Sequence, residues 1–394
     1  MEIMEKALLD HFKNPKLSPL NRRLGPIRLF THLPVHEAFK KYDQKYRITK
    51  RRHIPPSIHE CRQTFNLAQV LVSAPGLKLV TFDGDETLYP DGHNFEDGEL
   101  SNLIIHILKT DCHVALVTAA GYGQDPSPYL NRLGRLIPDI VFATSRDTKM
   151  RTRFWVFGGE SNYLFNLSED GQLRVVAYHQ WESFSPIGFT ESRNLHECSR
   201  LLDVAEVALR AGVKDLGLRA RVIRKERAAG VIPGGSTAYM PVGSGARKIK
   251  QEILEELVCR VRDAVTAADC TGIPYCAFNG GRDVWVDVGN KAIALRVLKS
   301  MLALDSTECL HIGDQFTESG NDTSVRNESP CIWVINPDET KAILRRICRG
   351  RGIKDYEQKI VLSDNEAQVQ TPLLIADLLA DEASNDDGGQ TDDW

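Results

Sequence analysis

Two carboxylates at the end of a short apolar run are the first candidates for chemistry. Residues 77–82 are followed at once by Asp83 and Asp85, with Thr87 close behind, in the string KLVTFDGDETLYPDG. A short run of this kind is typical of a buried strand, so both acids are expected at a strand tip. Their mutual repulsion there is costly unless a cation shares the site.

Three further signals stand at comparable places along the chain. Thr118 ends the run HVALVT, Lys291 opens KAIALRVLKSML, and Asp314 ends CLHIGD. Asn321 and Asp322 follow Asp314 by seven and eight residues. Because ligands bind outside the carboxyl ends of strands in open α/β sheets, these side chains are expected to converge on one site.

Grouped carboxylates with one hydroxyl and one ammonium favour a reaction at phosphorus. Asp83 and Asp85 point opposite ways on an extended chain, so they are predicted to play different parts. Asp83 is placed to attack phosphorus and form an aspartyl-phosphate, and Asp85 to act as general acid and base. Thr118 would hydrogen-bond a phosphoryl oxygen, and Lys291 would offset negative charge on the nucleophile and the transferring group.

The same cluster predicts a magnesium site. Mg²⁺ prefers few carboxylates together with water and phosphate oxygens. Asp314, with Asp83, would hold the ion, and Asn321 and Asp322 would steady its shell. Each signal alone has an ordinary explanation as a solvated loop acid, a strand-ending threonine or a solvated lysine. The prediction depends on all four signals occurring in this order.

The segments that carry these residues alternate between strand and helix. Strands are expected at 77–82, 113–118, 139–144, 309–314 and 331–336, and helices at 96–110, 128–136, 291–302 and 338–349. This alternation predicts an α/β fold with a parallel sheet and crossover helices.

A different pattern interrupts this core. Residues 153–179 alternate in polarity and turn at Glu169, Asp170 and Gly171, as an antiparallel hairpin does. Residues 246–267 follow as a long amphipathic helix. The predicted division is a core of 71–146 and 287–380 with an inserted α+β domain of 147–286.

The two ends of the chain differ from both units. Residues 1–70 are expected to be helical, and 39–52 carry seven Lys and Arg against one acid. Pro55 and Pro56 separate the two helical pieces. Residues 381–394 are acidic and are expected to be a disordered tail.

Composition limits the class of protein. The 394 residues carry a net charge of −4, with 42% hydrophobic and 26% charged residues, which predicts a soluble globular protein without a general affinity for nucleic acid. Nine cysteines without a C-x-x-C pair indicate reduced thiols and a cytoplasmic location. No stretch of about 18 apolar residues occurs, so no membrane association is expected.

The four motifs in this order resemble the haloacid dehalogenase superfamily of phosphohydrolases, and the insertion between Thr118 and Lys291 resembles its second cap type. A closer similarity is to the IMP-specific 5'-nucleotidase family. It is carried by KLVTFDGDETLYPDG, FNGGRDVWVDVGNK and LHIGDQFTESGND behind a basic helical N-terminal section. The resemblance implies a Rossmann-like core, a cap domain, and Mg²⁺-dependent hydrolysis of inosine 5'-monophosphate (IMP) to inosine and phosphate.

The resemblance also assigns binding residues. Metal ligands would be Asp83, Asp314 and the backbone carbonyl of Asp85. Candidates for holding IMP are Asp85, Asp91, Thr118, Asp283 and Lys291. Trp285, on the last cap strand, could stack on hypoxanthine or be an ordinary core tryptophan, and Asp91 could equally be a turn residue.

Members of this family are activated by ATP through the N-terminal section and tend to be homotetramers. Lys45, inside the basic stretch, is the best candidate for an ATP contact, although that stretch could equally be a solvated helix face. Gln63 is a second candidate, and it stands where the family has a histidine. Two alternative functions stay open: a phosphomutase or sugar phosphatase of the phosphomannomutase type, and a non-catalytic nucleotide sensor.

Two other apparent signals are set aside. The glycine-rich segment 232–246 lacks the closing G-K-[ST] of a phosphate-binding loop, so we expect a cap loop there. His93 and His311 are single histidines, for which a structural or solvated role is expected.

Overall fold

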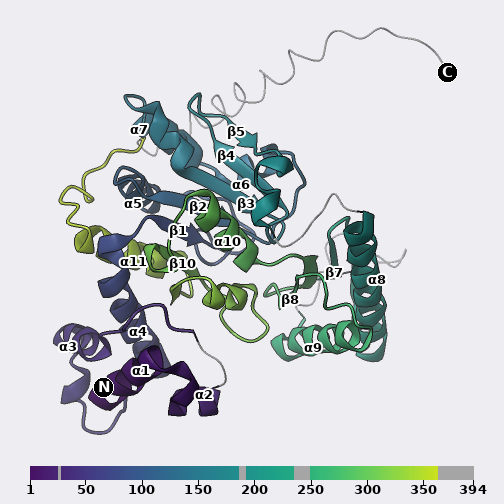
Figure 1. The fold of residues 1–394 in the computed structure, drawn as a ribbon, viewed down its shortest axis with the longest axis horizontal. Helices are drawn as coiled ribbons and strands as arrows, with labels where there is room; N and C mark the ends of the chain where they lie inside the picture. Colours follow the sequence, from purple (N-terminus) through teal and green to yellow (C-terminus); the bar gives the residue numbers. More distant parts are fainter. Residues whose placement is uncertain (25–27, 186–191, 235–248, 363–394) are drawn as a thin grey trace.

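The structure is a computed structural model that describes residues 1–24, 28–185, 192–234 and 249–362. Figure 1 shows a central sheet flanked by helices, a smaller sheet with two helices beside it, and N-terminal helices packed on the central part. The predicted acidic tail and most of the glycine-rich segment lie outside the described residues.

In the described chain, seven strands form the central sheet in the order β11-β10-β1-β2-β3-β4-β5. They are β1 (Leu79–Phe82), β2 (His113–Val117), β3 (Phe154–Gly158), β4 (Tyr163–Leu167), β5 (Leu173–Val175), β10 (Cys309–Gly313) and β11 (Cys331–Trp333). β1 pairs in parallel with β2 and β10, with Phe82 opposite Leu116 and Ile312. The carboxyl ends of these three strands therefore lie at one edge of the sheet, and the predicted α/β fold is confirmed.

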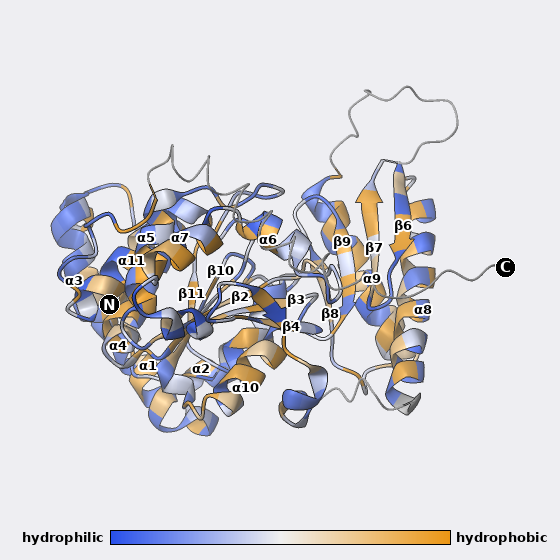
Figure 2. Ribbon diagram, turned by 90° about the horizontal axis from the view of Figure 1, so that it is seen from above, coloured by the Kyte–Doolittle hydropathy of each residue, from blue (hydrophilic) through white to orange (hydrophobic). Residues whose placement is uncertain are grey.

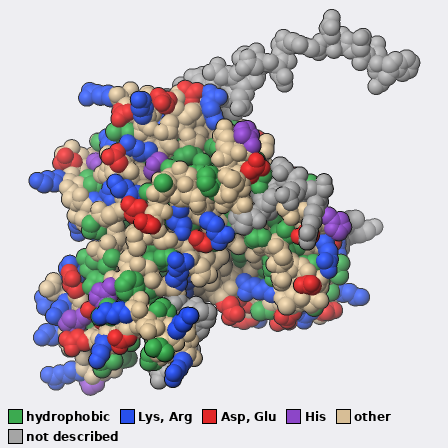
Figure 3. Space-filling model, viewed as in Figure 1, with side chains coloured by type: hydrophobic (Ala, Val, Ile, Leu, Met, Phe, Trp, Pro, Cys, Tyr) green, Lys and Arg blue, Asp and Glu red, His purple; other side chains and the backbone are tan. Residues whose placement is uncertain are grey.

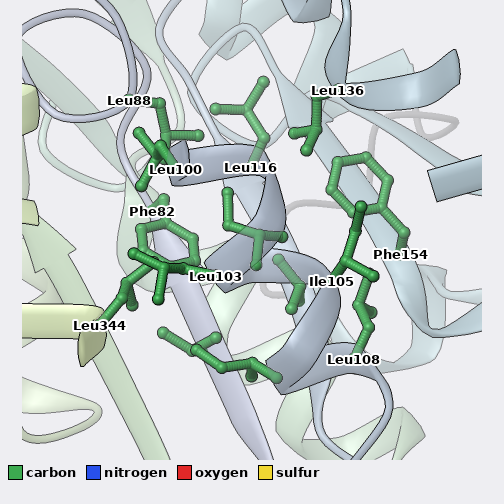
Figure 4. Packing of buried hydrophobic residues seen from close by; sticks show 14 of the residues in the cluster. Phe82, Leu88, Leu100, Leu103, Ile105, Leu108, Leu116, Leu136, Phe154 and Leu344 are labelled. Atoms are coloured by element: carbon green, nitrogen blue, oxygen red, sulfur yellow. The ribbon is translucent and has the colours of Figure 1, made fainter. Parts of the chain in front are cut away.

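Helices cover both faces of this sheet. They are α5 (Gly98–Leu108), α6 (Ser127–Leu133), α7 (Leu136–Ala143), α10 (Lys291–Met301) and α11 (Pro337–Gly350). Along β1, Phe82 packs with Leu103 of α5 and Leu344 of α11, as Figure 4 shows, whereas Leu79 belongs to the cluster that includes α10. A strand buried on both faces carries apolar residues on both of them, which is why β1 lacks polar alternation. Its one polar side chain, Thr81, is buried and contacts His311.

The predicted strand at 139–144 is wrong, because these residues belong to helix α7. A continuous apolar run fits a buried helix as well as a buried strand. Pro138 lies in the first turn of α7, where a missing N–H breaks no helical bond. Asp139 also forms an ion pair with Arg135 at 3.0 Å, one helical turn earlier.

The alternating segment 153–179 does fold as antiparallel strands, but its place differs from the prediction. β3 pairs in parallel with β2, and β4 and β5 continue the central sheet by antiparallel pairing. The division predicted from the sequence places this segment in the inserted domain of 147–286, and that part of the prediction is wrong. The turn between β4 and β5 is where the sequence predicted it, but turn chemistry does not reveal which sheet a hairpin joins.

The second sheet has the order β6-β7-β9-β8. Its elements are α8 (Ser192–Asp215), β6 (Ala220–Arg224), β7 (Ala228–Pro233), α9 (Gln251–Ala267), β8 (Tyr275–Asn279) and β9 (Val284–Val288). α8 and α9 cover the face turned away from the central sheet (Figure 2). Val284, Val286 and Val288 of β9 pack in the cluster that includes these helices, so Trp285 and Asp287 face the other way. We call this unit the cap.

The N-terminal section consists of α1 (Glu2–Lys13), α2 (Pro19–Leu24), α3 (Val35–Tyr46) and α4 (Ile58–Ser73). Ser57 and Glu60 form a capping box that starts α4, beyond the predicted proline break. Lys and Arg side chains, with acids among them, gather over this section in Figure 3. α4 contacts α11 and β11, which joins the section to the core. Among the described helices, none is both long and apolar enough to cross a membrane.

Candidate active site

The predicted site residues meet at the carboxyl edge of the central sheet. Asp83 follows β1, Thr118 follows β2 and Asp314 follows β10. The carboxylate of Asp83 accepts a hydrogen bond from the N–H of Gly84 at 2.7 Å, and the Thr118 hydroxyl accepts one from Ala120 at 3.1 Å. Parallel pairing alone therefore brings together three residues that are far apart in sequence.

Lys291 lies fully buried beneath this edge, at the first position of α10. Its Nζ is 2.8 Å from Oδ1 of Asp83 and 2.6 Å from Oδ1 of Asp322. Burial alone would lower the pKa of Lys291, but its attraction to Asp322 and Asp83 raises this pKa well above the ordinary value. The ammonium therefore stays charged between the two acids.

The three carboxyl groups of Asp83, Asp314 and Asp322 carry more negative charge when ionised than the single ammonium of Lys291 can balance. Burial raises the pKa of Asp83 to about 6, although Lys291 opposes the shift. Burial, with repulsion from Asp83 and Asp322, raises the pKa of Asp314 well above its ordinary value. Asp322 differs: Lys291 and His311 outweigh burial and lower its pKa.

A divalent cation fits this excess of negative charge. Asp83, Asp314 and Asp322 each place a carboxylate oxygen within 4.8 Å of the others. Oδ1 of Asp314 is buried without a hydrogen-bond partner in the described structure. An all-oxygen donor set with an unpaired carboxylate oxygen suits Mg²⁺.

Asp322 is already occupied by protein partners. Its Oδ1 contacts Lys291 and His311 Nε2, the latter at 3.0 Å, and its Oδ2 accepts from the N–H of Gln315 at 2.9 Å. His311 also contacts Thr81 at 2.8 Å. Asp322 is thus suited to support the site, and His311 lies buried in that support, consistent with the structural role expected for it.

Glu160 is a site neighbour that the sequence analysis missed. Its side chain is fully buried, and burial raises its pKa to about 7. Oε1 accepts a hydrogen bond from Nδ2 of Asn321 at 2.9 Å, whereas Oε2 has no partner among the described residues. The Gly-Gly-Glu-Ser turn at the end of β3 is a signal for this residue, but the predicted division places β3 in the insertion and so away from the site.

Asp85 lies at the same edge but in a different environment. Its Oδ1 accepts from Nη2 of Arg132 at 2.5 Å and from the N–H of Gly92 at 3.0 Å. Arg132 also stacks over the Tyr89 ring, 4.7 Å from its centroid. Arg132, on α6, was not predicted from the sequence.

A cleft of about 810 Å³ extends from these carboxylates to the cap. Asp91, Asp283 and Trp285 line it, as the exposed His93 does. Asp91 forms an ion pair with Arg282 of the cap at 2.9 Å. The wall of the cleft that lies opposite the core is therefore formed by the cap, as the resemblance implies.

Charged groups also surround the tryptophan on the cap wall. Nζ of Lys225 is 4.6 Å from the Trp285 ring centroid. Burial raises the pKa of Asp283, and it raises the pKa of Asp287 still further above the ordinary value. Trp285 is partly exposed to the cleft and is not a core tryptophan.

The two predicted effector residues lie elsewhere. Lys45 is exposed near the end of α3, and Gln63 is buried in α4. Neither of them lines the cleft. Any ligand that they bind would occupy a second site.

Comparisons with known proteins agree with this geometry. A family model described as IMP-specific 5'-nucleotidase matches residues 3–344. IMP-specific 5'-nucleotidase 1 of Plasmodium falciparum is 42% identical over 347 residues, covering 87% of this chain and 76% of that protein. The Yarrowia lipolytica protein of the same name is 35% identical over 350 residues, covering 86% and 79%.

Solved structures of the Plasmodium falciparum IMP-nucleotidase are also similar. An IMP-bound mutant has a TM-score of 0.79 at 41% identity, covering 88% of this chain and 86% of that one. An ATP-bound form has a TM-score of 0.76 at 40% identity, covering 91% and 81%. These similarities extend over the core, the cap and much of the N-terminal section.

Proposed function

The chain belongs to the IMP-specific 5'-nucleotidase family, and from this premise we propose its reaction. We propose that the enzyme hydrolyses IMP to inosine and phosphate. The observation that carries the proposal is the buried contact between Lys291 and Asp83, 2.8 Å, at the head of the cleft. A nucleophilic carboxylate beside a fixed ammonium is suited to accept a phosphoryl group.

The first chemical step involves Asp83. One of its carboxylate oxygens attacks phosphorus, a P–O bond to Asp83 forms, and the bond from phosphorus to the ribose 5'-oxygen breaks. Asp85 donates a proton to the leaving oxygen, so inosine departs as a neutral alcohol. Lys291 and the Thr118 hydroxyl stabilise charge on the transferring group.

The second step returns the enzyme to its starting state. Asp85, now ionised, takes a proton from water, and the resulting hydroxide attacks the phosphorus of the aspartyl-phosphate. The bond between phosphorus and Asp83 breaks, and phosphate leaves. Arg132 and the N–H of Gly92 both contact Oδ1 of Asp85, so the other carboxylate oxygen, Oδ2, would exchange the proton with the reacting oxygen.

Mg²⁺ would be held by Asp83, Asp314 and the backbone carbonyl of Asp85, with Asn321 and Asp322 as support. When bound, it supplies positive charge that neutralises the carboxylates and the phosphate. Support comes from the unpaired Oδ1 of Asp314 and from the grouping of the acids.

The cap would select the purine nucleoside. Trp285 of the cap offers an aromatic face for hypoxanthine, and Asp283 of the cap and Asp91 of the core offer acceptors for ribose or base. Support comes from their position on the cleft, and from the IMP-bound relative from Plasmodium falciparum.

We further propose ATP activation through the N-terminal section, with Lys45 and Gln63 as contacts. The ATP-bound relative supports a second nucleotide site of this kind. A homotetramer in the cytoplasm is our further expectation. Sedimentation of the full chain, with and without ATP, tests the assembly.

Incubation with IMP and Mg²⁺ tests the proposed reaction. Equal amounts of inosine and phosphate are expected, with IMP preferred in a panel of nucleoside monophosphates. A hexose phosphate isomerised without phosphate release would favour a phosphomutase, and IMP binding without any release of phosphate would favour a sensor.

A further inference from the structure

The edge strand β11 is held by a side chain of the N-terminal section. Nδ2 of Asn66, on α4, donates to the carbonyl of Trp333 at 2.7 Å, and Oδ1 of Asn66 accepts from the N–H of Trp333 at 3.2 Å. β11 has no further strand beside it in the central sheet as described. The amide of Asn66 thus takes the place of a neighbouring strand at this one residue.

Arg62 strengthens the same contact. Its Nη1 donates to the carbonyl of Trp333 at 2.5 Å, and its guanidinium pairs with both carboxylate oxygens of Glu339, at 2.7 and 2.8 Å. The exposed fractions of the Arg62 and Glu339 side chains are only 9% and 14%. A shielded pair with two bonds is more rigid than an exposed one. α4 therefore fixes the Trp333 backbone with two side chains, Arg62 and Asn66.

The indole of Trp333 points to the candidate metal site. Its Nε1–H donates to the backbone carbonyl of Asp314 at 2.7 Å. Gly313 is paired with Trp333 in the sheet, and its carbonyl accepts from the N–H of Val334 at 2.9 Å. The backbone on either side of the Asp314 Cα is thus tied to Trp333 of β11 and to Val334, which follows it, while Oδ1 of Asp314 has no partner among the described residues.

We infer that Trp333 is a positioning residue that fixes Asp314 for a divalent cation and makes the cation affinity depend on the docking of α4. The inference rests on the proposed function only in taking Asp314 as a cation ligand. Gln63, a predicted effector contact, is the residue after Arg62. An effector bound there would act on this same linkage between α4 and the cation.

The indole hydrogen bond separates positioning from simple docking. Arg62 and Asn66 bind the backbone of residue 333, and the guanidinium of Arg62 also lies 5.8 Å from the centroid of the Trp333 ring. An aromatic side chain at 333 would therefore keep the docking of α4. Only a donor on that side chain reaches the carbonyl of Asp314. Trp333→Phe removes the donor and keeps an aromatic ring.

The test is a calorimetric titration of the full-length protein with Mg²⁺ in the absence of substrate. Trp333→Phe should weaken Mg²⁺ binding by about tenfold, the lower end of losses for groups that orient metal ligands. At saturating Mg²⁺ its kcat should stay within about twofold, since the ligand itself is intact. Asn66→Leu, which removes the clamp at similar volume, should weaken Mg²⁺ binding by about threefold.

Trp155→Phe is the matched control. Trp155 lies on β3 of the same sheet and donates to His113 at 3.1 Å, away from the acids. This variant should bind Mg²⁺ as the unchanged protein does. If it loses as much affinity as Trp333→Phe, the effect is general loosening and the inference is wrong.

The remaining outcomes also decide the question. Wild-type Mg²⁺ affinity in both Trp333→Phe and Asn66→Leu overturns the inference, whether or not IMP is hydrolysed. If Trp333→Phe does not fold, Asn66→Leu alone decides. Weakened Mg²⁺ binding in a protein that does not hydrolyse IMP would support the positioning role and reject the proposed function.

Discussion

The two walls of the cleft are built differently. On the core wall, Asp83, Lys291 and Asp322 are buried and joined by contacts of 2.6–2.8 Å that need no substrate. On the cap wall, Trp285 is partly exposed, and Arg282 reaches Asp91 across the cleft with 69% of its side chain exposed. One wall is fixed by the fold, and the other is held by exposed contacts.

This contrast indicates how the enzyme divides its work. A pre-formed charge arrangement lowers the barrier to phosphoryl transfer because no reorganisation is needed during the reaction. Selection of the nucleoside can depend on weaker contacts that form when the substrate joins the two walls. Substitutions in the core wall should therefore affect kcat most, and those in the cap wall should affect KM.

The largest effect is expected at the nucleophile. Asp83→Asn should lower kcat by at least about 10⁴-fold, since loss of a nucleophile removes the covalent route. Phosphate release from IMP measures this. Asp263→Asn, an exposed position on α9, should keep full activity as the matched control. Near-normal release by Asp83→Asn would contradict the mechanism.

Asp85→Asn should lower kcat by about 10³-fold, a typical loss for a general acid and base. Phosphoenzyme formation should survive better than turnover, most clearly with a good leaving group such as p-nitrophenolate. Rapid quenching separates the two steps. Equal losses in both would show that Asp85 does not have the part assigned to it.

Glu160 should make stability depend on pH. Its pKa is about 7 in the folded protein, against an ordinary value of 4.5. Below pH 4.5 both states hold the proton; between 4.5 and 7 only the unfolded state loses it, so stability falls as pH rises, by up to about 3 kcal/mol. Above 7 no further loss follows.

Glu160→Gln removes this dependence because the amide does not titrate. The free energy of unfolding is measured for both proteins by urea unfolding. The difference, variant minus unchanged protein, should become more positive from pH 4.5 to 7. Glu256→Gln, on the surface of α9, should show no such trend. Parallel pH profiles for Glu160→Gln and the unchanged protein would contradict the assignment.

On the cap wall, Trp285→Ala should raise KM for IMP by about tenfold, since stacking on a base contributes about 1–3 kcal/mol. Hydrolysis of p-nitrophenyl phosphate, which lacks a purine, should change little. If both substrates are affected alike, Trp285 does not read the base.

The smallest effect is expected for the exposed ion pair between Arg282 and Asp91. Arg282→Ala should change the free energy of unfolding by less than about 0.5 kcal/mol, as exposed pairs typically do. Thermal unfolding measures it. A loss comparable to that of a buried pair would mean that the cap wall is as rigid as the core wall.

The same contrast explains what the sequence could predict. Asp83, Thr118 and Asp314 could be placed together because each ends a strand, and parallel strands share an edge. Lys291 followed from its place at the start of a helix and from the order of the four signals, and Asp322 from its spacing after Asp314. The resemblance, not the spacing, brought in Asp91, Asp283 and Trp285.

Other features depend on tertiary pairing that a single sequence does not reveal. Glu160 belongs to the site only because β3 joins β2, and Arg132 only because α6 lies beside Asp85. Residues 139–144 could be helix or strand until their packing was known. The helix α8 was not predicted, although its buried residues Leu201, Leu202, Ala205 and Leu209 stand at helical spacing and Gly217, at positive φ, follows its end.

The covalent step at Asp83 is the central claim, and one measurement tests it most directly. Asp85→Asn is mixed with ³²P-labelled p-nitrophenyl phosphate and Mg²⁺, quenched in acid at times from milliseconds to minutes, digested and mapped by mass spectrometry. We predict a phosphoryl group on the peptide that contains Asp83, lost on treatment with hydroxylamine. Label on another residue, or none while p-nitrophenolate is released, would contradict the account.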